Sequence, residues 1–465
     1  MHRFTFLSKL LRQGTPIVSE KEHSLVSHKL LQHIGALSPT SPGVFVFSPV
    51  ILRAIEKLCT FIDYKMAEVG GQKCIFPTLG SSQLWSQSGR WDKFGGEMFR
   101  LSDRTGKSFC LQPTHEEEVC SFVSGLGIGS NALPLRVYQI SSKFRDEIQP
   151  KLGLLRCREF LMQDMYSFDL DVEHAKETYK TLSNVYSEIL SSLHLPFYRV
   201  EAEGGLMGDC PSDEFHCPLA VGEDSLVVCQ NCKKAVLATH SGSMTCPQCG
   251  SDRQLIKSVE VAHCFLLGNT YTSSFNVRAS TQDIVRTLQM GCYGIGVTRL
   301  LATALEHFTT TLTNETPPSE LRWPPGFAPF SGAIALQKDN AKDALSPDEL
   351  SLLLARFNES PPANPSTSSF FSGLLPRGDI LIDDRPRLSL GRKLVDLRQL
   401  GVPWILIAKS HKADAKSSYE LVDVTRGVSS SASLEEALSA FTHSDFRPSL
   451  HDGSRLWHRT DTRSH

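Results

Sequence analysis

Two β-strands joined by a short loop are predicted by QISSKFRDEIQPKLGLLRCREFLMQDMYSFD, the segment Gln139–Asp169. Aromatic and β-branched residues fill both ends of the segment, whereas Pro150 and Gly153 mark the loop. Arginines, acids and an aromatic ring flank this loop. Such a hairpin can hold a nucleotide, because arginine grips phosphate through paired N–H groups, a carboxylate accepts from an amine and a ring stacks on a base. For the tripeptide RDE alone, an ion-paired hairpin without a ligand would be the simpler interpretation.

The full string resembles motif 2 of the class II aminoacyl-tRNA synthetases, in the form found in prolyl-tRNA synthetases of the bacterial and mitochondrial type. Four further segments resemble that family in the same order. They are KCIFPTL (Lys73–Leu79, motif 1), LQPTHEEEV (Leu111–Val119, the amino-acid loop), GCYGIGVTRLLA (Gly291–Ala302, motif 3) and LIDDRPRLSLGRKLVDLRQLGVPWILIA (Leu381–Ala408, the anticodon-binding domain). The resemblance spans roughly residues 40 to 410, and several motifs in order are far more specific than any one.

The resemblance implies an ATP site and an amino-acid site. Arg145 would hold the α-phosphate and the proline carboxylate, Glu147 the adenine amino group and Arg156 the γ-phosphate. Phe160 and Arg299 would cover the two faces of adenine, which makes Arg145 and Arg299 the expected catalytic residues. The remaining expected contacts are Thr114 and Glu116 to the ammonium of proline, Mg²⁺ on the pyrophosphate, and Pro77 at a homodimer interface. No protein nucleophile is required, since the proline carboxylate attacks the α-phosphorus and the tRNA 3′ hydroxyl then attacks the adenylate.

Alternation along the second strand of the hairpin places Phe160, Met162, Asp164 and Tyr166 on one face of the sheet. Because Phe160 would stack on adenine, Met162, Asp164 and Tyr166 are expected to extend the same face into the proline-binding site.

Four of the thirteen cysteines form two C-x-x-C pairs, Cys229 with Cys232 and Cys246 with Cys249. Two such pairs can close a tetrahedron of thiolates around zinc. Redox dithiols or chance are the alternatives, and a single redox site would need only one pair. Four protein ligands leave no open position, so the predicted Zn²⁺ is structural.

Length and composition describe a soluble globular protein of two or three domains. The 465 residues carry a net charge of −2, which gives no overall nucleic-acid signature, and no apolar run approaches the ~20 residues of a membrane span. The expected fold class is an α+β class II catalytic domain with a mixed or antiparallel sheet over 21–318. A zinc-ribbon-like insertion is expected at about 226–252, a linker at 319–332 and an α/β anticodon-binding domain at 333–465.

Two long amphipathic helices are predicted within the catalytic region. Apolar residues recur at helical spacing from Leu52 to Val69, and a second helix follows the capping residue Asp171, from Val172 to Leu193. The interval between motifs 2 and 3 is too short for both the zinc ribbon and the editing domain of many bacterial relatives. The segment 204–224 resembles the part that closes over proline, but Asp209–Cys210–Pro211 and Asp213 stand where small residues and a histidine are more usual. Two extra carboxylates beside the substrate carboxylate would be unfavourable unless they turn outward.

The first twenty residues differ from the rest, with basic residues, Ser and Thr, and no acid before Glu20. Phe4, Leu7, Leu10 and Leu11 would share one helical face. This pattern predicts a mitochondrial presequence over 1–20 and therefore a place in the mitochondrial matrix. An ordinary amphipathic N-terminal helix is the alternative.

Three functions are compatible with these motifs. The first is an active prolyl-tRNA synthetase, with ATP, L-proline and tRNA(Pro) as substrates. The others are a catalytically inactive synthetase-like protein that binds tRNA or nucleotide, and a zinc-ribbon nucleic-acid adaptor. Retention of Arg145, Arg156 and Arg299 favours the first. In the C-terminal domain, Arg385, Arg387, Arg392 and Trp404 are candidates for contact with anticodon bases, although Trp404 also suits a strand core.

Overall fold

A computed structural model describes residues 4–11, 25–203, 205–207, 210–281, 284–313, 317–359, 379–411 and 416–442. Within them the chain forms two compact units. Unit 1 combines Met1–Thr40, Phe45–Phe61 and Ala304–Ser449, and unit 2 contains Ser41–Val44 and Ile62–Thr303. The compact units therefore differ from the expected boundaries at residues 20 and 318.

The centre of unit 2 is a nine-stranded sheet. Its pairs are antiparallel except for β4 with β8, which is parallel. The predicted hairpin is confirmed as β8 and β9, and the mixed sheet is confirmed with it. In spatial order the strands are β10 (Tyr198–Ala202), β11 (Ser212–Pro218), β14 (Arg253–Gly268), β17 (Gln289–Gly296), β9 (Glu159–Asp169), β8 (Leu135–Phe144) and β4 (Gln72–Lys73), with β12 (Asp224–Cys229) and β13 (Ala235–Leu237) branching from β14.

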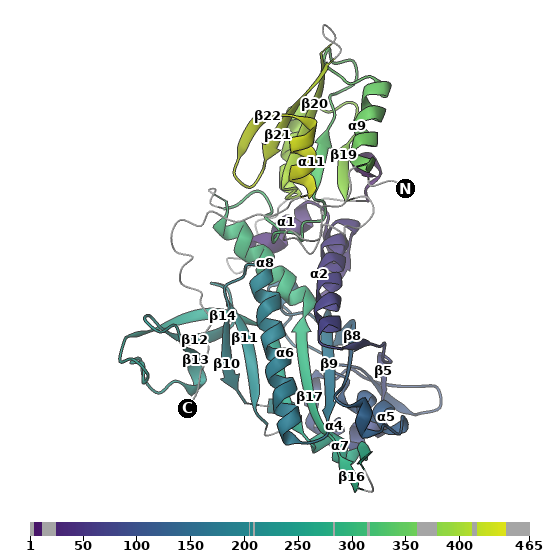
Figure 1. Cartoon of the computed structure of the whole chain (residues 1–465), viewed down its shortest axis with the longest axis vertical. Helices are drawn as coiled ribbons and strands as arrows, with labels where there is room; N and C mark the ends of the chain where they lie inside the picture. The colour runs from purple at the N-terminus through teal and green to yellow at the C-terminus, as the bar shows by residue number, and fades with distance from the viewer. Residues whose placement is uncertain are drawn as a thin grey trace. The chain divides into compact units, whose positions relative to one another are not determined.

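Both predicted long helices are present. Helix α6 (Val172–Ser192) begins where the Asp171 side chain accepts a hydrogen bond from the His174 amide, and it packs against β9, β14 and β17 (Figure 1). Helix α2 (Pro49–Glu68) ends before Gly70, whose φ of 71° is the left-handed conformation that glycine adopts readily. The capping residue and the helical period were both local signals, which is why the sequence predicted these elements well.

A smaller layer of short elements completes unit 2. Motif 1 contributes less strand than expected, because β4 covers only Gln72–Lys73 and the segment that follows is irregular. The other elements are β5 (Leu79–Ser81), β6 (Arg100–Ser102) and β7 (Ser108–Leu111) in one sheet, β15 (Arg278–Thr281) and β16 (Ile284–Thr287) in another, and helices α3 (Ser82–Gln87), α4 (Arg90–Lys93), α5 (Glu116–Gly125) and α7 (Thr270–Ser274).

Unit 1 is built on a six-stranded sheet whose first four strands are parallel, as expected for an α/β domain. The apolar faces of helices α9 and α11 help to close its core, through Leu353, Phe357, Ala437 and Phe441. The strands are, in order, β1 (Phe4–Phe6), β19 (Ile380–Asp383), β18 (Gly332–Ala335), β20 (Trp404–His411), β21 (Lys416–Asp423) and β22 (Val428–Ala432). The helices include α1 (Val26–His33), α9 (Pro347–Glu359), α10 (Leu390–Gln399) and α11 (Leu434–Thr442). Helix α8 (Val297–Thr311) and the pair β2 (Leu37–Ser41) and β3 (Val44–Phe47) begin in one unit and end in the other.

The predicted N-terminal helix is wrong where the structure describes this segment. Phe4–Phe6 form strand β1, paired in parallel with β19, and Leu7–Lys9 form one turn of 3₁₀ helix. Phe4 and Leu7 are buried, and the backbone N–H and hydroxyl of Ser8 both donate to Asp384. The edge strand is more stable than a helix here, because the sheet of unit 1 buries Phe4. An isolated short helix would have no such partner surface.

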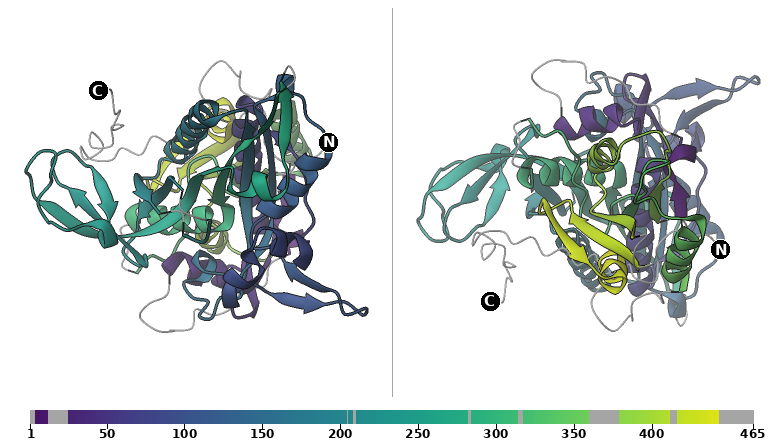
Figure 2. Two further views of the ribbon diagram at one scale, coloured as in Figure 1. Left: turned by 90° about the horizontal axis from the view of Figure 1, so that it is seen from below. Right: turned by 90° about the horizontal axis from the view of Figure 1, so that it is seen from above.

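The segment with the paired cysteines forms an arm of unit 2. Strands β12 and β13 and the first part of β14 extend outward from the rest of the nine-stranded sheet (Figure 2). Within the described residues, every helix is too short or too polar to cross a membrane.

Candidate active site

The register of the sheet collects the predicted site residues on one face. Across the hairpin, Gln139 stands opposite Asp164, Ser141 opposite Met162 and Lys143 opposite Phe160. On the other side of β9, Gly294 and Gly296 of β17 stand opposite Asp164 and Met162. The two glycines leave this part of the face without side chains of their own.

Two arginines with incomplete pairing meet at the end of the hairpin. The Arg145 guanidinium lies 5.5 Å from the centre of the Phe160 ring, and its buried Nε has no hydrogen-bond partner. Burial lowers the pKa of Arg145, and the charge of Arg299 lowers it further. A Cβ at Gly296 would lie 3.3 Å from the Arg299 Cβ, so glycine there lets this arginine approach. Two facing cations with an unused donor form a site for an anion.

Arg299 is oriented by backbone carbonyls. Its Nε donates to the Leu155 carbonyl at 2.9 Å and its Nη1 to the Glu260 carbonyl at 3.1 Å. These two contacts fix the plane of the guanidinium without neutralising it. The Glu260 carboxylate is farther away, 4.0 Å from Nη1.

Glu147 and Arg156 are paired with each other in this structure. Arg156 Nε lies 2.7 Å from the Glu147 carboxylate, and its Nη1 lies 2.7 Å from Glu223. The pKa of Glu147 is below its usual value, because the hydrogen bond and charge of Arg156 outweigh the effect of burial. Both side chains are partly exposed, so a ligand can replace this pairing at small cost.

Thr114 and Glu116 are brought together as predicted. The Thr114 hydroxyl lies 2.8 and 2.7 Å from the two oxygens of the Glu116 carboxylate, which is fully buried. Cys292 of β17 donates to Glu116 from 3.1 Å, and Arg90 donates from 3.0 Å. A buried carboxylate must be paired or hydrogen-bonded to stay charged, and this one has three donors.

Asp164 and Tyr166 lie deeper than the sequence suggested. Asp164 contacts Lys143 at 2.7 Å, while the Tyr166 hydroxyl donates to Asp164 at 2.8 Å and accepts from the His115 amide at 3.0 Å. Lys143 also contacts His115 Nδ1 at 2.7 Å, and Gln139 donates to Asp164 at 3.0 Å. This buried network attaches the amino-acid loop to both strands of the hairpin. Met162 is only half-buried on the same face.

A second acidic group lies beside Arg299. Potential ligand atoms of Glu214, Glu260 and His263 lie within 4.8 Å of one another. Burial alone would raise the pKa of Glu260, but the hydrogen bond from His263 and the charges of His263 and Arg299 lower it to about 2. Glu260 is therefore an ionised carboxylate at neutral pH. Asp213, one position earlier on β11, pairs with Tyr179 and Arg199, at 2.6 Å from each, whereas Asp209 lies outside the described residues.

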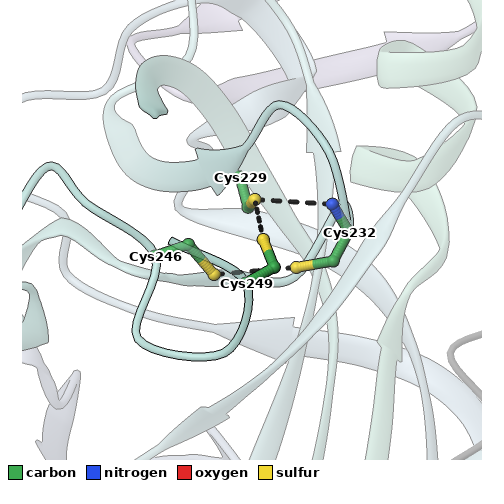
Figure 3. A group of neighbouring side chains, drawn as sticks. All are labelled: Cys229, Cys232, Cys246 and Cys249. Atoms are coloured by element: carbon green, nitrogen blue, oxygen red, sulfur yellow. Dashed lines mark hydrogen bonds between the residues drawn. The ribbon is translucent and has the colours of Figure 1, made fainter. Parts of the chain in front are cut away.

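The four paired cysteines meet at one point of the arm (Figure 3). Cys229 Sγ lies 3.4 Å from Cys249 Sγ and Cys232 Sγ lies 3.7 Å from Cys246 Sγ, with all four sulfurs within 4.8 Å of one another. A tetrahedral Zn–S₄ site with bonds of about 2.3 Å has sulfur–sulfur edges of about 3.8 Å. The donor set and spacing thus fit zinc.

The comparisons with known proteins agree with this geometry. Residues 99–308 match the family of the tRNA synthetase class II core domain (G, H, P, S and T). A probable mitochondrial proline–tRNA ligase of Rattus norvegicus is 38% identical over 399 residues, which cover 85% of this chain and 80% of that protein. The chain belongs to the prolyl-tRNA synthetase family of class II. A second member, the probable mitochondrial proline–tRNA ligase of Schizosaccharomyces pombe, is 34% identical over 83% of this chain and 86% of its own length.

Solved prolyl-tRNA synthetases share the fold. The enzyme of Giardia lamblia in complex with prolyl-adenylate gives a TM-score of 0.69 at 18% identity, covering 90% of this chain and 79% of the other. That of Cryptosporidium parvum, complexed with halofuginone and AMPPNP, gives 0.66 at 15% identity, covering 90% and 77%. The predicted class II fold is confirmed.

Several residues of this site carried no signal in the sequence. A lone lysine in a strand pattern is usually exposed, which gives Lys143 no distinction, Cys292 belongs to neither C-x-x-C pair, and Arg90 stands alone in SGRW. Glu260 lies in an ordinary strand pattern. The sheet register, which pairs His263 with Gly294 and Cys292 with Tyr166, brings the strand residues of this site together, and helix α4 supplies Arg90.

Proposed function

We propose that this chain activates L-proline with ATP to form prolyl-adenylate and transfers the prolyl group to the 3′ end of tRNA(Pro). Family membership supports the activity. The residue assignment rests mainly on the pair of cations Arg145 and Arg299, which have no carboxylate hydrogen-bonded to them among the described residues, together with the buried Thr114–Glu116 pair. The triphosphate of ATP requires a site for an anion, and proline requires a site for its ammonium group. Here the two sites lie side by side.

In this proposal Arg145 binds the α-phosphate and the proline carboxylate, and Phe160 and Arg299 cover the two faces of adenine. Glu147 accepts from the adenine amino group, and Arg156 exchanges Glu223 for the γ-phosphate. The carboxylate of proline attacks the α-phosphorus while the arginines compensate the charge that builds up on the phosphoryl oxygens. The protein contributes alignment and charge, so no side chain has to form a covalent bond.

Thr114 and Glu116 receive the secondary ammonium of proline, and Met162 lines the site beside them. For Asp164 and Tyr166 we propose a supporting role instead of direct contact, because both are fully buried and bonded to Lys143 and the amino-acid loop. The specificity for proline then depends on the position of Glu116.

Mg²⁺ is implied by the reaction, and the acidic group beside Arg299 suits it. Glu260 and Glu214 supply the carboxylate oxygens that this ion prefers. Bound there, Mg²⁺ would supply positive charge to the phosphates of ATP and to the leaving pyrophosphate. Structural Zn²⁺ would be held by Cys229, Cys232, Cys246 and Cys249.

Homodimer formation and location extend the proposal. Pro77 is exposed next to Ile75, which is 88% exposed, and Leu79, so the motif 1 segment presents an apolar surface that a second copy can cover.

The relatives named mitochondrial support a place in the mitochondrial matrix. The interval between motifs 2 and 3 holds β10 to β16 in its described residues, and we propose that it contains no separate editing domain.

Unit 1 is the proposed anticodon-binding unit. Of the candidate contacts, Arg385 is engaged with Asp383 and Asp396, and Trp404 packs against the core of the sheet. Arg387 and Arg392 are exposed, which makes them better candidates for bases of a single-stranded loop.

Replacing Arg299 tests the assignment of the ATP site. Arg299→Ala should lower the single-turnover rate of prolyl-adenylate formation by about 10²–10³, the usual effect of losing one preorganised charge contact. Arg278→Ala is the matched control, because Arg278 is exposed and its guanidinium donates to the Asn276 side chain at 3.1 Å. Equal rates for both variants would contradict the proposed role, and circular dichroism would verify that both fold.

A further inference from the structure

Arg90 is buried beneath the amino-acid loop, outside every motif considered so far. Its Nη1 donates to Glu116 at 3.0 Å and to the two oxygens of Glu117 at 3.1 and 3.3 Å. Both carboxylates are fully buried, and Arg90 itself is 6% exposed. The guanidinium is thus a shared partner of two neighbouring acids at the start of α5.

Aromatic rings hold this guanidinium in place. Its carbon lies 4.8 Å from the ring centre of Trp85, 5.4 Å from that of Tyr271 and 5.5 Å from that of Phe94. Cation–π contacts from three elements, α3, α7 and the end of α4, stabilise the charge without neutralising it. Arg90 therefore cannot easily move away from Glu116.

Direct ion pairs join three carboxylates of the buried cluster to two cations. Among the described residues, Glu116, Glu117 and Asp164 pair with Arg90 and Lys143. Arg145 attracts Glu116 by its charge, without an ion-pair contact. Neutral side chains also face the two glutamates: Ser88, Thr114, Cys110, Cys120, Cys292 and Tyr271. Burial lowers the pKa of His115 to about 4, so this ring is neutral as well. In direct contacts, three carboxylates therefore share two cations.

We propose that Arg90 is a positioning residue for the amino acid: it fixes the Glu116 carboxylate, and because two acids share it, the ammonium group of the substrate can serve as a further direct cation partner of the cluster. This inference rests on the proposed function. It explains why two adjacent buried glutamates share a single arginine, since a second arginine would neutralise the cluster before the substrate arrives.

The titration of Glu117 is consistent with this charge count. Burial raises its pKa to about 7, Arg90 opposes the rise and Glu116 adds to it. Below pH 7 a proton would therefore occupy the place of the missing positive charge. Because proton and ammonium compete, the KM for proline should rise as the pH falls below 7.

The test is ATP–pyrophosphate exchange with proline by the full-length protein, measuring the KM for proline and the KM for ATP separately. Arg90→Met should raise the KM for proline by about 10- to 100-fold, the usual effect of losing charged hydrogen bonds, and leave the KM for ATP nearly unchanged. Arg90→Lys should restore part of the affinity, because it keeps the charge but cannot bond both acids in the same way. Arg100→Ala is the control, since Arg100 stacks on Trp91 in the same region without touching Glu116.

If Arg90→Met does not fold, Glu117→Gln tests the proposed role of the buried cluster in proline binding. It keeps the shape and removes the unmatched charge, so the KM for proline should rise and its dependence on pH near 7 should disappear. An unchanged KM for proline and an unchanged pH profile in Glu117→Gln would overturn the inference. Absence of proline-dependent exchange in the unmutated protein would instead overturn the proposed function.

Discussion

His115, in the amino-acid loop, forms a hydrogen bond at each of its two ring nitrogens. Its Nε2 lies 3.0 Å from the Pro77 carbonyl, which can only accept, so Nε2 carries the proton. Nδ1 is then free to accept from Lys143 at 2.7 Å. Both contacts require the neutral ring, and burial together with the charge of Lys143 lowers the pKa of His115 to about 4.

A pH dependence of stability follows from this ring. The folded pKa lies below the ordinary value of 6.5, so the contribution of His115 is complete above pH 6.5 and is lost as the pH falls towards 4. The loss amounts to about 3 kcal/mol at most, at 1.36 kcal/mol for each unit of pKa. His115→Gln cannot titrate, so its free energy of unfolding should fall less between pH 7 and pH 4 than that of the unmutated protein. If the free energy of unfolding from urea denaturation falls in parallel for both proteins, the role given to His115 is wrong. His28 and His307 are present in both proteins, so their titration does not affect the comparison.

The role of a residue could be predicted from the sequence only where the residue lies in a recognisable motif. Thr114, Glu116, Arg145 and Arg299 lie in recognisable strings, and the structure brings them to one face. The partner of Arg90, in contrast, is 26 residues away, and nothing in the local sequence distinguishes this arginine from a surface one. The burial of Asp164 could not be foreseen either, because alternation gives the face of a residue but not its depth.

Strand β1 is the element that departs most from the sequence prediction. Phe4, Leu7 and Leu11 recur at helical spacing, yet Phe4 lies in a three-residue strand whose partner β19 is at the other end of the chain. Sequence patterns give local structure, so a pairing between such distant segments leaves no mark in either one. Phe4–Phe6 are part of the sheet of unit 1, and a presequence extending to residue 20 would include them.

The contribution of this strand can be measured by thermal or urea unfolding. Phe4→Ala should destabilise unit 1 by about 3 kcal/mol, as expected for removing a buried ring from a core that includes Ile334 and Phe441. Leu11→Ala is the control, because Leu11 is 73% exposed. If both variants unfold like the unmutated protein, β1 does not contribute to the stability of the sheet.

The cysteine arm offers a second test at the level of an element. Purified protein should contain one zinc ion per chain, and Cys229→Ser or Cys246→Ser should abolish it and destabilise the arm. Activity should fall only through displacement of the neighbouring strand β14, which carries Glu260. Cys59→Ser, in helix α2, should keep its metal. Metal-free protein that is fully stable and active would exclude a structural zinc site.

At the scale of the whole molecule, the compact units do not follow the linear order of the chain. Catalytic motifs run continuously from residue 73 to 302, yet Met1–Thr40 and Phe45–Phe61 group with Ala304–Ser449 in one compact unit. Composition could mark the linkers, but it could not show that two separated segments complete one unit. The class of fold was predictable, because each long helix and the central hairpin carry their own local signals.

The central claim is that the nine-stranded sheet presents a proline-activating site. Amino-acid-dependent ATP–pyrophosphate exchange over the twenty amino acids tests it most directly. Proline should support exchange far better than threonine, serine or glycine, because Thr114 and Glu116 are placed for its ammonium group. Alanine should be weakly active, since a smaller apolar substrate loses only about 1–3 kcal/mol of contacts. Exchange driven best by another amino acid, or by none of the twenty, would contradict the account.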